Sequence, residues 1–242
     1  MNNKNNNKIQ FKKVSIMEKS KLILKNLTIE TEEKKILKDI NMEFEFPGIN
    51  LLSGENGSGK STLLHSIFNN PSYKKSGQII YEKNGKLIDL TKLKTNEISK
   101  LGFFLSFQNP IEISGLILRD FLWIIYKEKF QETKIENLEF NKTIEKHCED
   151  LELKKELLDR ELNKNYSGGE KKKVELLQIM ILDPEVLFLD EIDTGVDIKS
   201  IEFFINKIKE MKDKGIIIVT HNKNFINLLE IKNEYSLNNI PF

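Results

Sequence analysis

The stretch GENGSGKS, from Gly54 to Ser61, combines residue types and a spacing that suit phosphate binding. It matches the pattern G-x-x-x-x-G-K-[ST], in which glycines let backbone N–H groups converge on phosphate oxygens. Lys60 would place a compact charge near the β- and γ-phosphates, and the hydroxyl of Ser61 would bind Mg²⁺. We therefore predict a nucleotide-phosphate site formed by Gly54, Glu55, Asn56, Gly57, Ser58, Gly59, Lys60, Ser61 and Thr62.

A second glycine turn, YSGGEKKK from Tyr166 to Lys173, precedes the apolar run VELLQIMIL, which is typical of a buried helix. A helix N-terminus behind a glycine turn attracts anions, because its unpaired N–H groups and the helix dipole both favour negative charge. The chain therefore presents two candidate anion sites that lie far apart in the sequence. The residues of the second are Ser167, Gly168, Gly169 and Glu170.

Two adjacent carboxylates, Asp190 and Glu191, end the apolar run VLFLDE. An aspartate at the end of a buried strand near a phosphate loop is suited to hold Mg²⁺. The glutamate beside it can orient and polarise an attacking water molecule. The predicted metal ligands are Ser61, Gln108 and Asp190.

Two other polar residues also end apolar runs. Gln108 follows FFLSF, and its amide can ligate Mg²⁺ or the lytic water; His221 follows IIIVT and can contact the γ-phosphate. The other histidines, His65 and His147, fall in helical stretches and are interpreted as structural. The predicted catalytic residues are Glu191, His221, Lys60 and Gln108.

Hydrophobic periodicity indicates the elements that must position these residues. Residues 40–46 alternate apolar and polar types, and residues 22–30 do so more weakly, which predicts half-exposed antiparallel strands. Residues 186–189 and 216–219 are continuous apolar runs, typical of strands buried on both faces of a parallel sheet, and residues 198–211 between them have helical spacing. We predict an α/β P-loop NTPase fold with a RecA-like core, a mainly parallel sheet and an N-terminal antiparallel β element.

The domain organisation is predicted from composition and spacing along the 242 residues. Residues 1–19 are polar and rich in Asn and Lys, which is typical of a flexible leader and lacks the apolar stretch of a secretory signal. Residues 20–242 are expected to form a single domain. Residues from about 114 to 165 are interpreted as an inserted α-helical subdomain.

Composition excludes several classes of protein. Charged residues make up 31% of the chain but the net charge is +1, and Arg119 and Arg160 are the only arginines, so a basic nucleic-acid binder is not expected. The single cysteine, Cys148, excludes an intrachain disulfide or cysteine metal site and is interpreted as a partly buried thiol in a helix. It suits a reducing compartment. No apolar run approaches the length of a membrane span.

The motifs, in the order P-loop, Gln108, SGGE, VLFLDE, TGVD and His221, closely resemble the ATPase domain of the ATP-binding cassette (ABC) superfamily. The resemblance covers the chain from about residue 20. YSGGE stands where that family carries its signature motif, usually LSGGQ, and Thr194 to Asp197 stand at its D-loop. One departure is the segment IETEEKKIL before the P-loop, which lacks the aromatic that often stacks on adenine, so weak base selectivity is expected.

The resemblance implies why one chain carries two anion sites. In such ATPases two subunits pair head to tail, and the signature residues of one face the γ-phosphate on the P-loop of the other. ATP would then join two copies of this chain, and hydrolysis would release them. ATP and Mg²⁺ are the expected ligands.

A finer resemblance is to the SufC subfamily, the ATPases of the Suf iron–sulfur cluster assembly machinery. It rests on FQNPIEISG at 107–115, SGGEKKKVELLQ at 167–178 and LDEIDTGVDI at 189–198. The resemblance implies that the chain docks on SufB- and SufD-like scaffold proteins, with no nucleic acid and no direct membrane insertion. The docking surface would lie near Gln108, and its candidate apolar residues are Ile111, Ile113, Leu116 and Trp123; ordinary core packing is the alternative for each.

Lys171 to Lys173 are interpreted as a solvated helix face. The resemblance suggests an alternative, in which Lys172 pairs with Glu191 in the isolated subunit and holds the base away from ATP. The chain also ends soon after His221, where the family continues with further strands and a helix, so a reduced C-terminal part is expected.

Three other functions remain open. The main alternative is the ATPase subunit of an ABC membrane transporter, which shares every catalytic motif. A nucleotide-gated binding protein with little turnover is disfavoured by Glu191 and His221, and a DNA-repair ABC ATPase is disfavoured by the short helical stretch between the motifs. We expect a cytoplasmic protein, with the stroma of a plastid-type organelle as the alternative.

Overall fold

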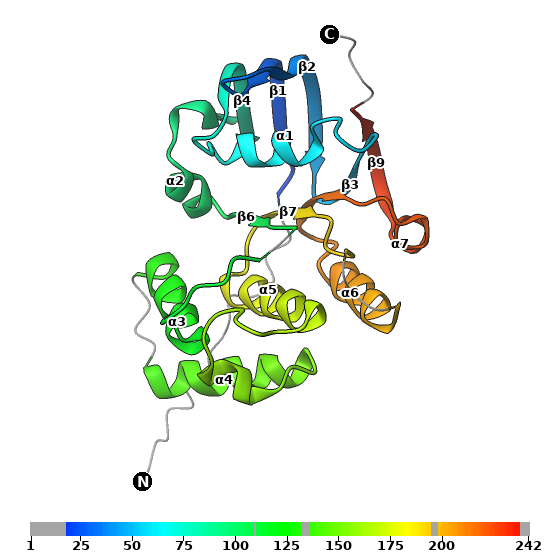
Figure 1. Ribbon diagram of the computed structural model, residues 1–242. Coiled ribbons are helices and arrows are strands. Elements are labelled where there is room, and N and C mark those ends of the chain that lie inside the picture. Colours follow the sequence, from blue (N-terminus) through cyan, green and yellow to red (C-terminus); the bar gives the residue numbers. More distant parts are fainter. Residues whose placement is uncertain (1–17, 109, 132–135, 195–197, 238–242) are drawn as a thin grey trace.

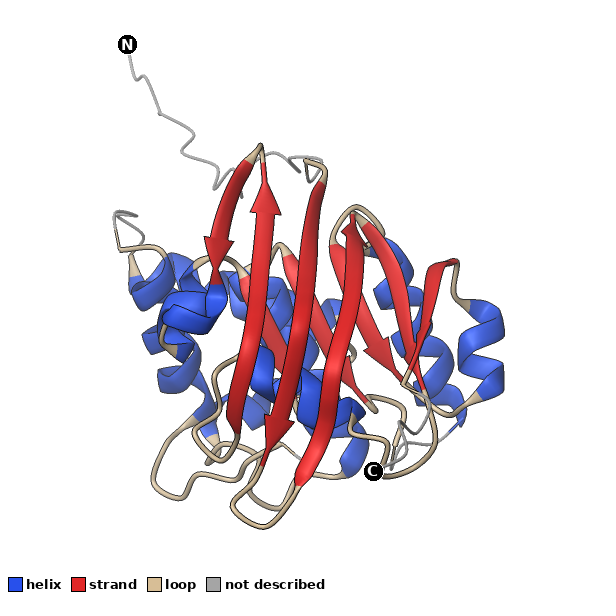
Figure 2. Ribbon diagram, turned by 90° about the horizontal axis from the view of Figure 1, so that it is seen from above, coloured by secondary structure: helices blue, strands red, loops and turns tan. Residues whose placement is uncertain are grey.

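Two β-sheets, with helices packed between and below them, form the protein (Figure 1, Figure 2). The computed structural model describes residues 18–108, 110–131, 136–194 and 198–237. The first sheet is antiparallel, with the strand order β2-β1-β4-β5. Its strands are β1 (Ser20–Glu30), β2 (Lys35–Phe46), β4 (Lys74–Lys83) and β5 (Lys86–Asp89).

The second sheet is parallel, with the strand order β6-β7-β8-β3-β9. Because the strands are parallel, their carboxyl ends meet at one edge of the sheet, and the loops that follow them gather there. The two predicted sheets are therefore confirmed. The strands of the second are β3 (Gly48–Ser53), β6 (Phe103–Ser106), β7 (Val186–Asp190), β8 (Gly215–Val219) and β9 (Ile231–Ser236).

Strand β7 shows why a continuous apolar run predicts a central parallel strand. Val186 and Phe188 belong to the core between the two sheets, whereas Leu187 and Leu189 belong to the core on the opposite face. Helix α1 (Lys60–Ile67) lies in the first of these cores, so it is sandwiched between the sheets. Both faces of β7 are thus covered, and alternation in its sequence is not required.

Helices cover the other face of the parallel sheet and extend away from it (Figure 1). The predicted helical stretch holds α3 and α4, and Cys148 of α4 is fully buried, where burial raises the pKa of its thiol to about 11. The helices other than α1 are α2 (Thr95–Lys100), whose Ile98 joins the core between the sheets, α3 (Leu118–Lys129), α4 (Asn137–Asp150), α5 (Gly168–Leu182), α6 (Ile198–Glu210) and α7 (Lys223–Leu228), with short 3₁₀ turns at Leu90–Lys92 and Lys155–Asp159.

Two elements follow His221 in the described chain: α7 and the edge strand β9. Strand β9 pairs with β3, the strand that leads into the P-loop, so the last described residues lie beside the predicted phosphate site. Most of the predicted leader lies outside the described residues. Among the residues that the structure describes, no helix is long and apolar enough to cross a membrane.

Candidate active site

The P-loop joins β3 to α1 through a turn that needs glycine at two positions. Gly54 has a φ of +150°, and a Cβ there would lie 2.6 Å from the carbonyl oxygen of Leu237 and 2.7 Å from Oγ of Ser58. Gly59 has a φ of +96° and is the N-cap of α1. Both values fall in the region that side-chain-bearing residues rarely adopt, so the sequence pattern has a direct conformational cause.

Lys60 folds back over this loop. Its Nζ donates hydrogen bonds to the carbonyl oxygens of Gly54 and Glu55, each at 2.8 Å, and burial lowers the pKa of its ammonium group. Oγ of Ser58 is buried and has no hydrogen-bond partner within the described chain. A buried hydroxyl without a partner beside a lysine suits an arriving phosphate oxygen.

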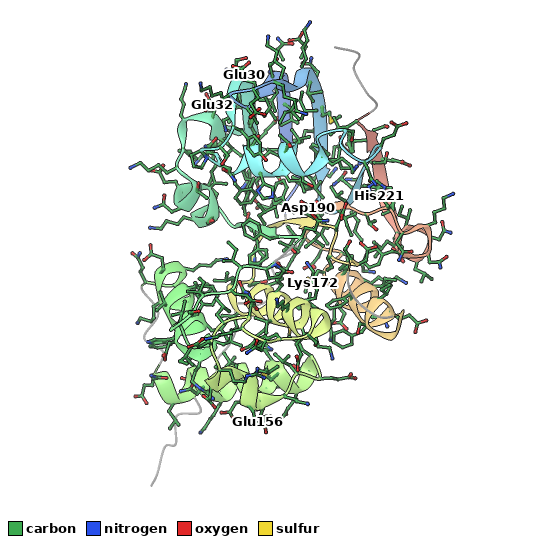
Figure 3. All side chains as sticks on the ribbon, viewed as in Figure 1. Glu30, Glu32, Glu156, Lys172, Asp190 and His221 are labelled. Atoms are coloured by element: carbon green, nitrogen blue, oxygen red, sulfur yellow. The ribbon has the colours of Figure 1, made fainter. Side chains whose placement is uncertain are left out.

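Asp190 is the last residue of β7 (Figure 3). Oγ of Ser61 donates to its Oδ1 at 3.0 Å. Asp190 is 1% exposed, burial raises the pKa of its carboxyl group, and neither a lysine nor an arginine forms an ion pair with it in the described chain. A buried carboxylate and a hydroxyl in contact fit a divalent cation, although the described residues include no cluster of three or more His, Cys, Asp or Glu side chains for a metal. Such a cation would need ligand oxygens from a nucleotide as well.

Glu191 is the centre of a second group of contacts. Its Oε2 accepts hydrogen bonds from Nε2 of Gln108 at 2.5 Å and from Oγ1 of Thr194 at 3.3 Å. Its Oε1 lies 3.9 Å from Nε2 of His221, and its backbone N–H donates to Val219. The structure thus brings together Gln108, Glu191 and His221 from the ends of three parallel strands.

Glu191 also has a φ of +47°, an uncommon conformation for a residue other than glycine. Thr194 was missed by the sequence analysis as a contact of Glu191, and residues 195–197 of the expected D-loop lie outside the described residues.

The second glycine turn begins α5 with a reciprocal pair of hydrogen bonds. Oγ of Ser167 accepts from the backbone N–H of Glu170 at 3.2 Å, and the Glu170 carboxylate accepts from the backbone N–H of Ser167 at 2.8 Å. This backbone hydrogen bond lowers the pKa of Glu170. No hydrogen bond in the described chain joins Ser167, Gly168 or Gly169 to the P-loop, so the two predicted anion sites are separate within one chain.

The lysines that follow are not a solvated face. Lys172 is 3% exposed and pairs with Glu175, not with Glu191, which contradicts the predicted Lys172–Glu191 contact. The spacing explains the difference, because residues three apart share a helix face and Glu175 is available at that distance. Lys171 pairs with Glu112, and Lys173 with Glu152.

His65 is closer to the site than its interpretation as structural implied. Its Nε2 lies 4.0 Å from Oδ2 of Asp190, and its ring lies 5.5 Å from that of Phe107. The signal was present in the sequence, since His65 follows Ser61 by four positions and must share its helix face. His147 is half-buried and lies near Asp150 instead.

The four candidate docking residues divide into two kinds. Leu116 and Trp123 pack against the helical core, and the Trp123 ring lies 5.0 Å from that of Phe140. Ile111 and Ile113 are 63% and 40% exposed. Together with Phe107 and Ile124 they line a groove between α2 and α3. Of the four residues, only Ile111 and Ile113 are exposed, whereas Leu116 and Trp123 are half-buried.

The segment before the P-loop supplies aliphatic side chains where an aromatic was missing. A Cβ at Gly59 would lie 2.8 Å from Cδ2 of Leu37 and 3.3 Å from Cγ2 of Ile36, so both residues border the phosphate loop. Aliphatic carbons can cover a base but lack the π-face of an aromatic ring.

The comparisons with known proteins agree with this geometry. The ABC transporter family model matches residues 37–194. The probable ATP-dependent transporter ycf16 of Antithamnion sp. is 38% identical over 191 residues, covering 76% of this chain and 74% of the relative. The probable ATP-dependent transporter slr0075 of Synechocystis sp. is 36% identical over 187 residues, covering 75% of this chain and 72% of the relative.

Solved structures share the fold. A dimeric post-hydrolysis state of the ATP-binding cassette MJ0796 bound to ADP and Pi has a TM-score of 0.72 at 21% identity, covering 88% of this chain and 93% of that one. A nucleotide-free cassette from an ABC transporter has a TM-score of 0.71 at 24% identity, covering 92% and 90%. The chain therefore belongs to the ABC transporter family and is an ATPase of the ATP-binding cassette type.

Proposed function

We propose that hydrolysis proceeds by in-line attack of water on the γ-phosphate, with Glu191 as the general base. The contacts of Gln108 and His221 with Glu191 support this assignment, since they would fix the carboxylate beside the attacking water. Lys60 and the loop N–H groups would hold the phosphates. The charge that develops on the phosphoryl oxygens would be offset by Lys60.

Ser61 and Asp190 would hold Mg²⁺, with Gln108 as a further ligand. The buried Asp190 carboxylate supports this proposal, since no lysine or arginine of the described residues forms an ion pair with it. A bound magnesium ion would neutralise negative charge on the phosphate oxygens. The Ser61–Asp190 hydrogen bond already holds the two protein ligands together.

The active form would be a head-to-tail homodimer joined by ATP. The separation of the two anion sites supports it, because no hydrogen bond joins the Ser167 turn to the P-loop of the same chain among the described residues. The dimeric MJ0796 cassette bound to ADP and Pi offers a precedent for the fold. Each nucleotide would lie between the P-loop of one copy and the α5 N-terminus of the other.

At the level of biology we propose a SufC-like ATPase, which powers iron–sulfur cluster assembly on a SufB- and SufD-like scaffold. The observation that carries this proposal is the match of three long segments to that subfamily, at 107–115, 167–178 and 189–198. Two structural facts agree with it. Cys148 is fully buried, so a cluster would be held by the scaffold, and Ile111 and Ile113 are exposed beside Gln108.

The docking surface on this proposal is the groove that Ile111, Ile113 and Ile124 line. Exposed apolar side chains along a groove suit the apolar face of a partner helix. Because the groove lies beside Phe107 and Gln108, a docked partner would touch the segment that contacts Glu191. Scaffold binding and ATP hydrolysis would then be coupled.

A pull-down from native extract, with Ile111→Asp/Ile113→Asp as the variant, tests this proposal. We expect SufB- and SufD-like proteins with the native chain and their loss with the variant, while the melting temperature stays unchanged. Leu87→Asp is the control, because Leu87 is 66% exposed and lies on β5, away from the groove. Recovery of a membrane permease instead would overturn the SufC-like role.

The second candidate function is the ATPase subunit of a membrane transporter. It is favoured by the names of the relatives, including a probable ABC transporter ATP-binding protein of Streptococcus pyogenes that is 36% identical over 182 residues. The same groove would then receive a permease. The SufC-like role places the protein in the cytoplasm or in the stroma of a plastid-type organelle.

A further inference from the structure

The backbone of Phe107 is held at both of its polar groups by a single ion pair. Its N–H donates to Oε1 of Glu175 at 3.0 Å, and its carbonyl oxygen accepts from Nζ of Lys172 at 2.9 Å. Lys172 and Glu175 also pair with each other at 3.1 Å. Both belong to α5, the helix that begins at the Ser167 turn, and Figure 3 shows Lys172 on that helix.

Burial makes this arrangement unusual. The side chains of Lys172 and Glu175 are 3% and 8% exposed, and burial raises the pKa of the Glu175 carboxyl group. A buried ion pair adds little to stability, because removing two charges from water offsets their attraction. Its geometric effect is stronger, since one donor and one acceptor on α5 fix a single peptide segment at both ends.

Phe107 immediately precedes Gln108, the residue whose amide contacts Glu191. Its ring also lies 5.5 Å from that of His65, whose Nε2 is 4.0 Å from Asp190. A shift of the Phe107 backbone would therefore move Gln108 away from Glu191. Lys171 adds a third link from α5 to this segment through Glu112, at 2.7 Å.

We propose that Lys172 and Glu175 are positioning residues, which hold Gln108 against Glu191 and connect that contact rigidly to the N-terminus of α5. This inference rests on the proposed roles of Glu191 as base and of the α5 N-terminus as a phosphate site, and it is independent of the scaffold. Lys172 lies five residues after Ser167, so any displacement of the helix N-terminus by a partner's nucleotide is passed on to Gln108.

The test is a double-mutant cycle on the full-length chain. Lys172→Met/Glu175→Leu replaces the pair with apolar side chains of similar size and removes both hydrogen bonds to Phe107. We expect kcat for ATP to fall by about tenfold or more, with KM within about twofold, because only the geometry of Gln108 is lost. In a Gln108→Ala background the same pair of substitutions should cause no further loss.

Lys207→Met/Glu210→Leu is the matched control. Lys207 and Glu210 form an ion pair with the same spacing, at 3.1 Å, on α6. We expect this control to leave kcat unchanged in both backgrounds. Thermal denaturation of every variant separates altered positioning from altered folding.

Equal losses of kcat in the native and Gln108→Ala backgrounds would overturn the proposal. If Lys172→Met/Glu175→Leu does not fold, Lys172→Met/Glu175→Gln keeps an acceptor for the Phe107 N–H, and its loss of kcat must likewise vanish in the Gln108→Ala background. Failure of the scaffold pull-down leaves this result unaffected, so the two proposals fail separately.

Discussion

The carboxylate of Glu170 stabilises the N-terminus of α5 but would repel a phosphate that binds there. Its carboxylate accepts the backbone N–H of Ser167, which is a stabilising contact at the N-terminus of α5. On the dimer proposal the partner's γ-phosphate would approach the same turn. A carboxylate there reduces the positive potential that would attract a phosphate, whereas glutamine, usual in the family at this position, would keep the hydrogen bond without the charge.

Glu170→Gln should therefore lower stability and strengthen ATP-driven association. We expect a loss of about 0.5 kcal/mol or less at neutral pH, because the side chain is partly exposed. The pKa of Glu170 is lowered in the folded state, so its contribution is present above the ordinary glutamate pKa and is lost as the pH falls through the folded-state pKa. Denaturation at several pH values and light scattering against ATP concentration measure the two effects.

The matched control is Glu97→Gln in α2, where the Glu97 carboxylate accepts the backbone N–H of Lys94 at 2.6 Å. It should show a comparable small loss of stability with no change in association. Weaker ATP-driven association in Glu170→Gln would contradict the placement of a phosphate at this turn.

Glu191→Gln tests the general base directly. The substitution keeps the size of the side chain and its capacity to accept from Gln108, but glutamine does not take a proton from water. We expect hydrolysis to fall by about a hundredfold or more while ATP binding is retained. Single-turnover hydrolysis and nucleotide titration give the two values, and Glu185→Gln, at a half-exposed carboxylate beside Lys83, is the control. Turnover near the native rate would exclude Glu191 as the base.

The residues of the site differ in how well the sequence predicted them. Lys60, Ser61 and Asp190 follow from motif and strand position, because parallel strands deliver their carboxyl ends to one edge. The role of Lys172 could not be predicted in this way, because the partner of Lys172 depends on which segment packs against α5. The sequence shows a lysine and a glutamate three residues apart, but only tertiary packing places the Phe107 backbone between them.

At the scale of elements, the residue that follows β9 contacts the start of the P-loop. The backbone N–H of Leu237 donates to the carbonyl oxygen of Ser53 at 2.9 Å, and its own carbonyl oxygen faces Gly54. Strand β9 thereby extends the parallel sheet beyond β3. The sequence predicted the central strands β7 and β8 from their apolar runs, but β9 alternates between half-buried and exposed residues, as expected at an edge.

Gly54→Ala should therefore lower the free energy of unfolding by more than the strain of a positive φ alone would cause. A Cβ would lie 2.6 Å from the Leu237 oxygen, so β9 or the loop must move. Gly85→Ala is the control, since Gly85 has a φ of +71° with open space around it in the β4–β5 turn. We expect the free energy of unfolding to fall by about 1 kcal/mol in the control and by clearly more in Gly54→Ala. Nucleotide binding should weaken only in Gly54→Ala. If denaturant unfolding gave equal losses of stability for the two variants, β9 would have to move aside without an energetic penalty, which would contradict this prediction.

At the scale of the whole molecule, the dimer proposal makes the sheet edge and the α5 N-terminus the two halves of one nucleotide site. The P-loop, Asp190 and Glu191 gather at the carboxyl ends of the parallel strands, whereas the Ser167 turn begins α5, a helix of the layer below that sheet (Figure 1). A two-fold symmetric pair would complete both sites at once, because each copy offers the half that the other lacks. This symmetry makes the dimer proposal testable by mixing variants.

Lys60→Ala should abolish the P-loop half of the site, and Ser167→Arg should abolish the half at the α5 N-terminus, so each variant alone is expected to be inactive. In a mixed dimer, however, the native P-loop of the Ser167→Arg chain meets the native turn of the Lys60→Ala chain, and one complete site forms. Mixing equal amounts should restore up to about a quarter of the native ATPase rate, since about half of the dimers are mixed and each has one intact site. ATPase assays of the mixture against each variant alone measure this gain. Differently tagged chains would show whether mixed dimers form. If they form and the mixture is no more active than the two variants assayed separately, a site shared between two copies would be contradicted.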